Sequence, residues 1–366
     1  MIKAEAPGEG DPLRSWGQAK VNGRSLWWPV QSRNKRLITL DLRTPEGQEI
    51  CRRLLDVCDV LIENFRPGTL ERWGLGPADL MERNPRLIVA RVSGYGQTGP
   101  YSSRAGFASA GEAIGGLRYI NGFPGEAPPR MGVSLGDSLA AMFATQGVLM
   151  ALVARERTGT GQVVDTAIYE SCFALLESAI PEYAATGLIR EPGGTRLKGI
   201  APSNLYRSRD GKWVVIAANQ DTLFRRLCEV MSRPELATDE RFRTHVARGE
   251  NQDQIDAIVG EWARSLDAVD LDRILNDAGV VSGPVYTVAD IFSDPQYAAR
   301  EMLVSTTDSE LGQVVGPGVV PKLSGTPGSV RWGGSWKLGE HNDEVYAKLL
   351  GMAPDELEKL TAAGVI

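Results

Sequence analysis

The stretch MGVSLGDSLAAMFATQGVLMALVARER, residues 131–157, decides the fold of this chain. Its single acidic residue, Asp137, precedes an uncharged run, residues 138–154, in which large apolar side chains alternate with alanine and glycine. This composition predicts a helix that is buried on most sides, with small residues that allow close backbone approach. Arg155 and Arg157 suit the negative end of the helix dipole. We therefore expect Asp137 at the helix N-terminus.

Two interpretations of Asp137 compete. In the first, the side chain is a helix N-cap whose carboxylate accepts hydrogen bonds from backbone N–H groups, and the local sequence favours this role because aspartate is a preferred cap. In the second, Asp137 is a nucleophilic carboxylate that the same helix N-terminus keeps ionised and holds in a fixed orientation. Only the rest of the chain can decide between them.

Composition limits the classes of function. The length of 366 residues predicts two domains, and the net charge of −6 argues against general nucleic-acid binding. The four cysteines form no CxxC pair and the two histidines lie far apart, so we expect no metal site and free thiols in a reducing compartment. The N-terminus is too polar for a signal peptide, and the uncharged run at 138–154 is too short and alanine-rich for a membrane span. These features predict a cytoplasmic protein without a membrane partner.

The first half of the chain alternates strand and helix patterns. Thr44 and Pro45 mark the N-cap and first residue of a helix whose Ile50, Leu54, Leu55 and Val57 face inward. Pro77 to Arg83 reads as a further helix, and apolar strands are predicted at 2–5, 37–41, 60–65 and 87–96. Such alternation predicts an α/β fold with a parallel, doubly wound sheet.

The second half indicates a smaller domain. A strand is predicted at 161–169, a helix at 170–185, and a Gly- and Pro-rich boundary or active-site loop at 191–204. A hairpin turns at Asp210-Gly211, and helices follow at 221–231, 251–265 and 269–278, before an extended stretch at 302–324 and two short helices within 340–362. We expect a large domain over 1–190, a small α+β domain over 200–290, and a return segment to the large domain over 300–366.

The loop GYGQTG, residues 94–99, matches the G-x-G-x-x-G pattern of dinucleotide-binding proteins. Its context argues against that function, because Pro100 follows at once and no strand ending in an acidic residue comes about 20 residues later. We interpret the glycines instead as positions where the backbone approaches a ligand closely.

Seven stretches together resemble one family. These are NKRLITLDLRTPEG (34–47), DVLIENFRPGTLERWGLG (59–76), NPRLIVARVSGYGQTGPY (84–101), LGDS (135–138), GTGQVVD (159–165), GVVSGPV (279–285) and LGEH (338–341). They occur in order over nearly the whole chain and resemble the class III CoA-transferases, the CaiB/BaiF family that includes formyl-CoA transferase and carnitine CoA-transferase. The resemblance implies a Rossmann-like large domain, an interlocked homodimer, and coenzyme A as part of the acyl-CoA substrate, with no tightly bound cofactor.

The resemblance also assigns the site. Asp137, in LGDS, matches the covalent nucleophile of the family. The positions that match CoA-contacting residues are Leu40, Arg43, Asn64, Phe65, Arg66, Arg72 and Arg104, and those that match the substrate loops are Phe107, Gly199, Ile200 and Ala201. Arginine forks suit phosphate oxygens. Taken singly, each arginine is equally well interpreted as a solvated surface charge, and the loop at residues 199–202 as an interdomain linker.

The implied reaction moves CoA from an acyl-CoA, with succinyl-CoA as one family donor, to a small carboxylic acid. Asp137 would form a mixed anhydride and then an aspartyl-CoA thioester, so that the energy of the thioester bond is conserved. Backbone N–H groups at the helix start would stabilise the oxyanion.

Two alternatives stay open. An acyl-CoA racemase or isomerase is disfavoured, because Phe107 stands where racemase relatives carry a proton-transferring histidine. A non-catalytic CoA-binding homologue is the other alternative, since the first strand–helix unit of the family, roughly 30 residues, is not found before Ile2. Whether the start codon is misplaced or the chain is truncated, we expect an unpaired sheet edge or an apolar groove where that strand would lie in the sequence as given.

Overall fold

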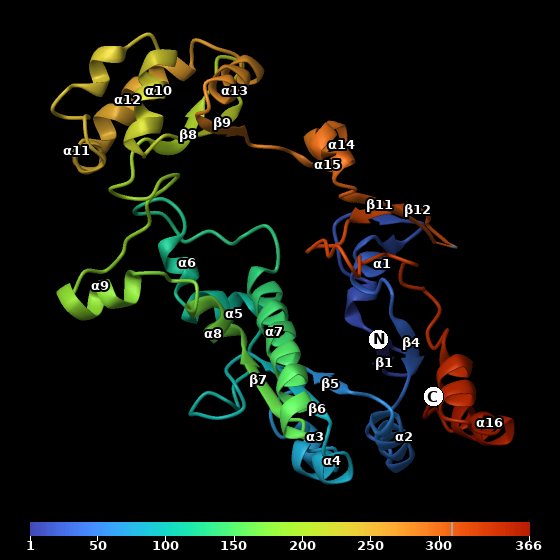
Figure 1. The fold of residues 1–366 in the computed structure, drawn as a ribbon. Coiled ribbons are helices and arrows are strands. Elements are labelled where there is room, and N and C mark those ends of the chain that lie inside the picture. Colours follow the sequence, from blue (N-terminus) through green and yellow to red (C-terminus); the bar gives the residue numbers. More distant parts are fainter. Residues whose placement is uncertain (309) are drawn as a thin grey trace. The chain divides into compact units, whose positions relative to one another are not determined.

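The computed structural model describes residues 1–308 and 310–366. The chain forms two compact units (Figure 1). The first unit comprises residues 1–107, 137–168 and 291–366, and the second comprises 108–136 and 169–290.

Parallel strands form the framework of the first unit. Strands β5 (Val60–Glu63), β6 (Ile88–Ser93) and β7 (Val163–Ala167) make one parallel sheet in the order β5-β6-β7, and β1 (Ile2–Glu5) pairs in parallel with β4 (Arg36–Thr39). The predicted α/β class with parallel pairing is therefore confirmed, although the strands lie in two sheets. Among the described residues, β1 pairs only with β4 and β5 only with β6, so β1 and β5 are edge strands.

The helices of this unit follow the capping signals in the sequence. Helix α2 (Pro45–Asp56) begins where predicted, with the Thr44 hydroxyl accepting a hydrogen bond from the Gly47 N–H at 3.0 Å. Helix α4 (Pro77–Arg83) has the predicted bounds. The prediction that Val57 faces inward is wrong: it follows the last residue of α2 and is 57% exposed.

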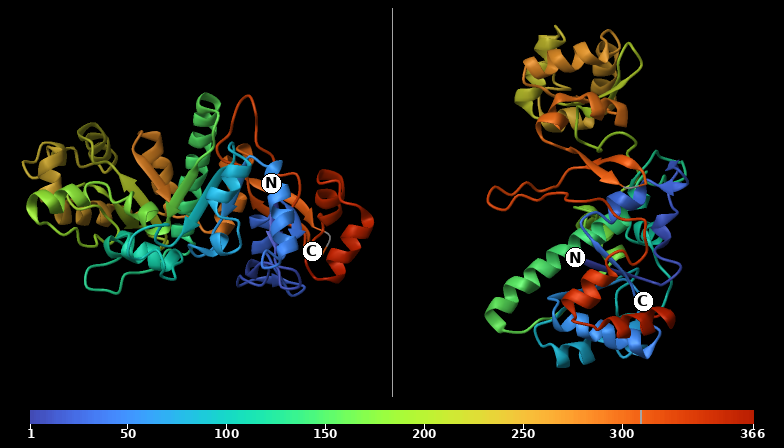
Figure 2. Two further views of the ribbon diagram at one scale, coloured as in Figure 1. Left: turned by 90° about the horizontal axis from the view of Figure 1, so that it is seen from below. Right: turned by 90° about the vertical axis from the view of Figure 1, so that its right-hand side faces the viewer.

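The C-terminal segment packs against the N-terminal one. The π-type helix η3 (Asp343–Leu349) and α16 (Pro354–Ala362) lie beside α2 and β4 in Figures 1 and 2. Their contact is an apolar core that includes Ile38, Ile50, Tyr346, Met352 and Ile366. The remaining elements of the first unit are η1 (Pro12–Arg14), β2 (Lys20–Val21), β3 (Arg24–Ser25), α1 (Trp27–Gln31), α3 (Thr69–Arg72), α15 (Pro295–Ala299), β11 (Leu303–Asp308) and β12 (Gly312–Pro317).

Helix α7 (Leu135–Thr158) is the longest helix among the described residues. It packs on β7 through small residues: a Cβ added at Gly147 would lie 2.6 Å from the Val164 side chain, and Ala140, Ala144 and Ala151 are buried. The prediction that α7 is buried on most sides is wrong for the single chain, because five of its large apolar side chains, those of Met142, Phe143, Leu149, Met150 and Val153, are exposed. By length and composition α7 could cross a membrane, a test that core helices of soluble proteins also pass.

The second unit has its own antiparallel sheet and core. Strands β8 (Ser203–Arg207), β9 (Trp213–Ala217) and β10 (Val281–Pro284) lie in the order β10-β9-β8, and Gly211 takes a positive φ of 81° in the predicted hairpin turn. The three predicted helices are confirmed within two residues as α10 (Asp221–Val230), α12 (Gln252–Ala263) and α13 (Ala268–Asp277), which bury an apolar core with the sheet. The other helices of this unit are α5 (Ala108–Ile114), α6 (Leu117–Ile120), η2 (Pro234–Ala237) and α11 (His245–Glu250).

The single helix predicted at 170–185 is wrong. The structure has two helices there, α8 (Ile168–Phe173) and α9 (Ala179–Thr186), with Glu177 at a positive φ of 50° between them. Pro181 lies in the first turn of α9, where proline is tolerated, whereas in the middle of a continuous helix it would remove a backbone hydrogen bond. Helix α14 (Val288–Ser293) spans the point at which the chain leaves the second unit, after Asp290.

Candidate functional site

The start of α7 is anchored by an acidic residue that sequence analysis did not single out. Glu112 of α5 is only 3% exposed, and its Oε1 atom accepts a hydrogen bond from the backbone N–H of Gly136 at 3.1 Å. The first N–H groups of a helix have no partner within the helix, so a carboxylate placed there satisfies one of them. Glu112 thereby fixes the backbone immediately before Asp137.

Asp137 lies in the first turn of α7, as predicted, and is exposed in the single chain. A carboxylate at this position is favoured in its ionised form by the helix dipole. An ionised, accessible carboxylate can attack an electrophilic carbonyl carbon.

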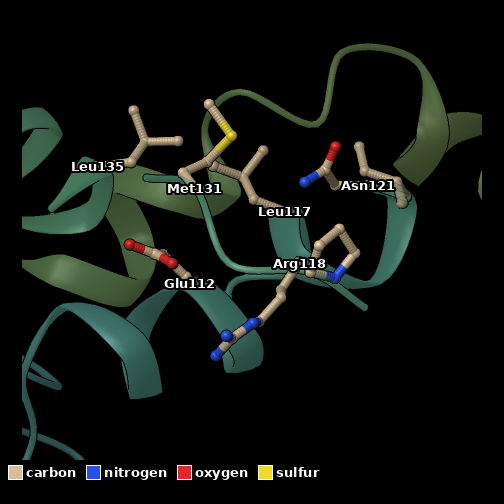
Figure 3. Close-up of a pocket in the computed structure, with 8 residues that line it drawn as sticks. Glu112, Leu117, Arg118, Asn121, Met131 and Leu135 are labelled. Atoms are coloured by element: carbon tan, nitrogen blue, oxygen red, sulfur yellow. The ribbon is translucent and has the colours of Figure 1, made fainter. Parts of the chain in front are cut away.

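A pocket of about 270 Å³ opens beside this helix start (Figure 3). Its lining residues come from α5, α6 and the segment leading into α7: Glu112, Leu117, Arg118, Ile120, Asn121, Pro129, Met131 and Leu135. In Figure 3 the charged ends of Glu112 and Arg118 lie on one side and the apolar side chains of Met131 and Leu135 on the other. The pocket therefore offers both an anchoring charge and an apolar wall to a small molecule.

The sequence carried a signal for this pocket. Glu112 is the one acidic residue in ASAGEAIGG, residues 108–116, and the other members of that stretch are small or apolar apart from one serine. An acid in such surroundings is expected to be buried and to have a partner. Arg118 gave no comparable signal, since an isolated arginine is usually a surface residue.

An ion triad, in which Arg91 and Glu63 are buried and Glu71 is exposed, positions the loop that follows β5. The Arg91 guanidinium, on β6, bonds to the Glu63 carboxylate at 2.7 Å and to the Glu71 carboxylate at 2.7 Å. Hydrogen bonding to Arg91 holds the pKa of Glu71 below its usual value. The second oxygen of Glu63 accepts the backbone N–H of Phe65 at 2.7 Å. The triad therefore fixes the backbone at residues 64–66, which the sequence predicted to bind CoA.

Four of the predicted CoA-binding residues come together after β5. Asn64, Phe65 and Arg66 form the loop and Arg72 ends α3, and the Arg72 guanidinium donates to the Thr69 hydroxyl at 2.9 Å. All four side chains are exposed, and Phe65 meets Trp73 edge-to-face with ring centroids 5.2 Å apart. Arg66 has no hydrogen-bond or ion-pair partner in the part of the chain that the structure describes.

The remaining predicted CoA-binding residues, Leu40, Arg43 and Arg104, lie outside the loop after β5. Leu40 is buried in the apolar core after β4. Arg43 forms a two-point ion pair with Asp41, with both distances 2.8 Å, which holds the pKa of Asp41 below its usual value. The Arg104 guanidinium stacks over the Tyr101 ring at 3.5 Å from its centroid. Both cations are exposed at the surface of the first unit.

Two backbone N–H groups of the GYGQTG loop are engaged within the chain. The Gly96 N–H donates to the Ser93 hydroxyl at 2.9 Å and the Gln97 N–H to the Asp165 carboxylate at 3.0 Å, so both groups already have partners within the chain. At Gly94 the missing side chain makes room for protein backbone, because a Cβ there would lie 2.7 Å from the Cα of Gly106; the approach of the glycines to a ligand stays a prediction. The close approach there is between two backbone segments of the protein.

The two predicted substrate loops lie in different units, and the loop at residues 199–201 is held by side-chain hydrogen bonds. Phe107 is 70% exposed at the end of residues 1–107 of the first unit. Gly199, Ile200 and Ala201 belong to the second unit, where Gln252 accepts from the Gly199 N–H at 3.1 Å and donates to the Ile200 carbonyl at 3.1 Å. Arg248 donates to the Ala201 carbonyl at 3.2 Å. This loop is therefore tied to α11 and α12 by side-chain hydrogen bonds.

No group of three or more His, Cys, Asp or Glu side chains could hold a metal ion among residues 1–308 and 310–366.

The comparisons with known proteins agree on one family that this chain is similar to. The model of a family described as CoA-transferase family III matches residues 1–342. A succinyl-CoA–D-citramalate CoA-transferase of Chloroflexus aurantiacus is 53% identical over 366 residues, which is 100% of this chain and 91% of the relative. The beta subunit of a succinyl-CoA–L-malate CoA-transferase from the same organism is 42% identical over 369 residues, covering 100% and 91%. A crystal structure of a CaiB/BaiF family protein from Brucella suis superposes with a TM-score of 0.81 at 36% identity, covering 95% of this chain and 91% of that one.

Proposed function

The chain belongs to CoA-transferase family III, and from this premise we propose that Asp137 is the residue through which it transfers CoA. The observation that carries the proposal is the position of Asp137 in the first turn of α7, directly after the N–H that Glu112 holds. A carboxylate in that position is ionised and oriented, which is what a nucleophile for a thioester requires.

The proposed reaction has two symmetrical halves. The Asp137 carboxylate attacks the thioester carbonyl of the donor, a mixed anhydride forms, and CoA leaves as its thiolate. The thiolate then attacks the Asp137 carbonyl carbon, which releases the donor acid and leaves an aspartyl-CoA thioester. The acceptor carboxylate attacks this thioester and repeats the two steps in reverse order, so one thioester is consumed and one is formed.

For the donor and acceptor we propose succinyl-CoA and a 2-hydroxy dicarboxylic acid such as D-citramalate. The support is the 53% identity to a succinyl-CoA–D-citramalate CoA-transferase and the 42% identity to a relative named for L-malate. An acyl-CoA racemase is the weaker candidate, since Phe107 cannot move a proton.

We propose that CoA lies along the loop after β5, with Arg66 and Arg72 at its phosphates and Asn64 and Phe65 along its length. The support is the set of exposed side chains that the Arg91 triad holds in one place. Leu40, Arg43 and Arg104 complete the proposed site by resemblance, and Arg43 would exchange its bond to Asp41 for one to a phosphate.

We further propose that two copies of the chain form an interlocked homodimer and that β1, β4 and β5–β7 belong to one doubly wound, Rossmann-like layer. The exposed apolar face of α7 supports an interface between copies, because five large apolar side chains on one helix are seldom left in water. The net charge of −6 is in keeping with a cytoplasmic enzyme that has no nucleic-acid partner.

The test is a transfer assay with the purified chain. Succinyl-CoA and D-citramalate should give citramalyl-CoA and succinate in equal amounts, and Asp137→Asn should abolish the exchange while Asp79→Asn, an exposed acid in the first turn of α4, should not. Hydroxylamine added with succinyl-CoA should label the peptide around Asp137 in the wild type only. Full activity of Asp137→Asn, or a label on another peptide, would refute the assignment.

A further inference from the structure

We propose that the pocket beside the start of α7 is a dicarboxylate subsite, in which Arg118 binds the carboxylate of the substrate that does not react. The inference rests on the proposed function for its reaction and adds the residue that selects the class of acid. Arg118 lines the pocket from α6, and Leu135 lines it from the first residue of α7.

The first observation is the state of the Arg118 side chain. It is half-buried, and it makes no hydrogen bond or ion pair within the part of the chain that the structure describes. The guanidinium is always charged, and its planar fork matches a carboxylate with two parallel hydrogen bonds. A carboxylate entering the pocket would therefore meet a guanidinium that forms no ion pair among the described residues.

The second observation is the acid that shares the pocket. Glu112 also lines it, but one of its oxygens is already engaged with the Gly136 N–H at 3.1 Å. Its negative charge disfavours a second anion beside it, so a diacid in the pocket places its free carboxylate at Arg118. Figure 3 shows the apolar side chains of Met131 and Leu135 on the opposite side, where a carbon chain or a methyl group would lie.

The third observation is the distance to the proposed nucleophile. Asp137 follows Leu135 by two residues in one helix, so the two Cα atoms lie about 5 Å apart by helix geometry. The pocket volume of about 270 Å³ suits a small acid and is below the usual range for drug-sized molecules. Asp137 does not line the pocket itself, so we place one carboxyl group of a four-carbon diacid at Arg118 in the pocket and the reacting one at the N-terminal end of α7, in whose first turn Asp137 lies.

One subsite then serves both halves of the reaction. The succinyl group of the donor and a 2-hydroxy dicarboxylic acceptor each carry a carboxylate that takes no part in the exchange. Because the two acids occupy the site in turn, Arg118 favours diacids over monoacids in both directions.

The experiment compares two acceptors that differ in one group. D-citramalate carries two carboxylates, and the monoacid with which it is compared, 2-hydroxy-2-methylbutanoate or 3-hydroxy-3-methylbutanoate, has a methyl group in place of the one that does not react. With succinyl-CoA saturating, Arg118→Gln should lower kcat/KM for citramalate about 10- to 100-fold, mainly through KM, and change the value for the monoacid less than about twofold. The matched control is Arg130→Gln, an exposed arginine of the same segment that does not line the pocket, and it should alter neither.

A binding measurement separates this inference from the proposed function. Succinate should raise the melting temperature of the wild-type chain and of Arg130→Gln more than butyrate does, and Arg118→Gln should lose that difference. Arg118→Lys keeps the charge without the planar fork, so its preference for succinate should lie between that of the wild type and that of Arg118→Gln. The lysine variant also provides the test if the glutamine variant does not fold. Equal losses for both acceptors, or an undiminished preference for succinate in both Arg118 variants, would overturn the subsite. A wild type that binds succinate through Arg118 and transfers no CoA would instead refute the proposed function alone.

Discussion

The carboxylate of Glu112 accepts a hydrogen bond from the backbone N–H of Gly136, 3.1 Å away and one residue before Asp137. A buried acid on one helix thus sets the first turn of another, and the proposed nucleophile lies at the junction. The bond satisfies a helix N–H that would otherwise be buried without a partner. Glu112 is accordingly a positioning residue, and its effect on chemistry should pass through Asp137.

Replacing Glu112 by alanine should reduce both stability and turnover. An unsatisfied buried N–H costs about 1–3 kcal/mol, and a loosened first turn should lower kcat more than it raises KM for succinyl-CoA. Glu112→Gln keeps an acceptor oxygen and should recover most of the stability and part of kcat. Urea unfolding and steady-state kinetics on both variants provide the test. If the alanine and glutamine variants have the same free energy of unfolding and the same kcat, the hydrogen bond to Gly136 does not account for the effect of Glu112.

The Arg91 triad should matter for stability and for CoA affinity together. Arg91→Met leaves the buried Glu63 carboxylate without its partner, which should cost about 3–5 kcal/mol. It should also release the loop at residues 64–66 and raise KM for succinyl-CoA. The control is Arg83→Met, which breaks an exposed ion pair with Asp56 and should cost at most about 1 kcal/mol. A similar loss of stability in both variants, measured by urea unfolding, would contradict this account.

Features that depend on short-range chemistry could be predicted from the sequence. Thr44 and Pro45 specify a helix start whatever surrounds them, and the structure has α2 beginning there. The turn at Gly211 needs a residue that tolerates positive φ, and this too is confirmed. Pro181 is an equally local signal, because a proline in the middle of a helix over 170–185 would remove a backbone hydrogen bond, and the structure places it in the first turn of α9.

Features that depend on distant partners could not be predicted in this way. The glycine at position 94 meets the backbone of Gly106, twelve residues later, and nothing in the loop GYGQTG distinguishes that contact from a contact with a ligand. The apolar residues of α7 look alike in sequence on both faces, yet only the face with Ala140, Ala144 and Gly147 is packed within the chain. For the site, Asp137 came from the family resemblance, whereas Glu112 and Arg118 became visible only when α5, α6 and the start of α7 were seen around one pocket.

The thiol of Cys228 should make the protein sensitive to alkali. Burial in the core of the second unit raises the pKa of this thiol from 9.0 to about 12. The unfolded chain loses the proton above about pH 9 while the folded chain keeps it, so this contribution to stability is complete below pH 9 and declines by roughly 1.4 kcal/mol per pH unit toward pH 12. Cys228→Ala should have a lower stability near pH 8 but a flatter decline above pH 9. The free energy of unfolding is measured by urea unfolding at several pH values. If it declines with pH at the same rate above pH 9 in the variant and in the wild type, another group is responsible.

The outer face of α7 should be the interface between two copies of the chain. Leu149 is 58% exposed there, and burying such a side chain contributes about 1.5–3 kcal/mol to an interface. A charge in its place would be buried without a partner, so Leu149→Glu should weaken dimerisation at least tenfold and shift the mass measured by light scattering toward the monomer. Val57→Glu changes an apolar residue of nearly equal exposure, 57%, at the end of α2, and should leave the dimer intact. An unchanged mass for Leu149→Glu at concentrations near the dissociation constant would mean that α7 is covered by something other than a second copy.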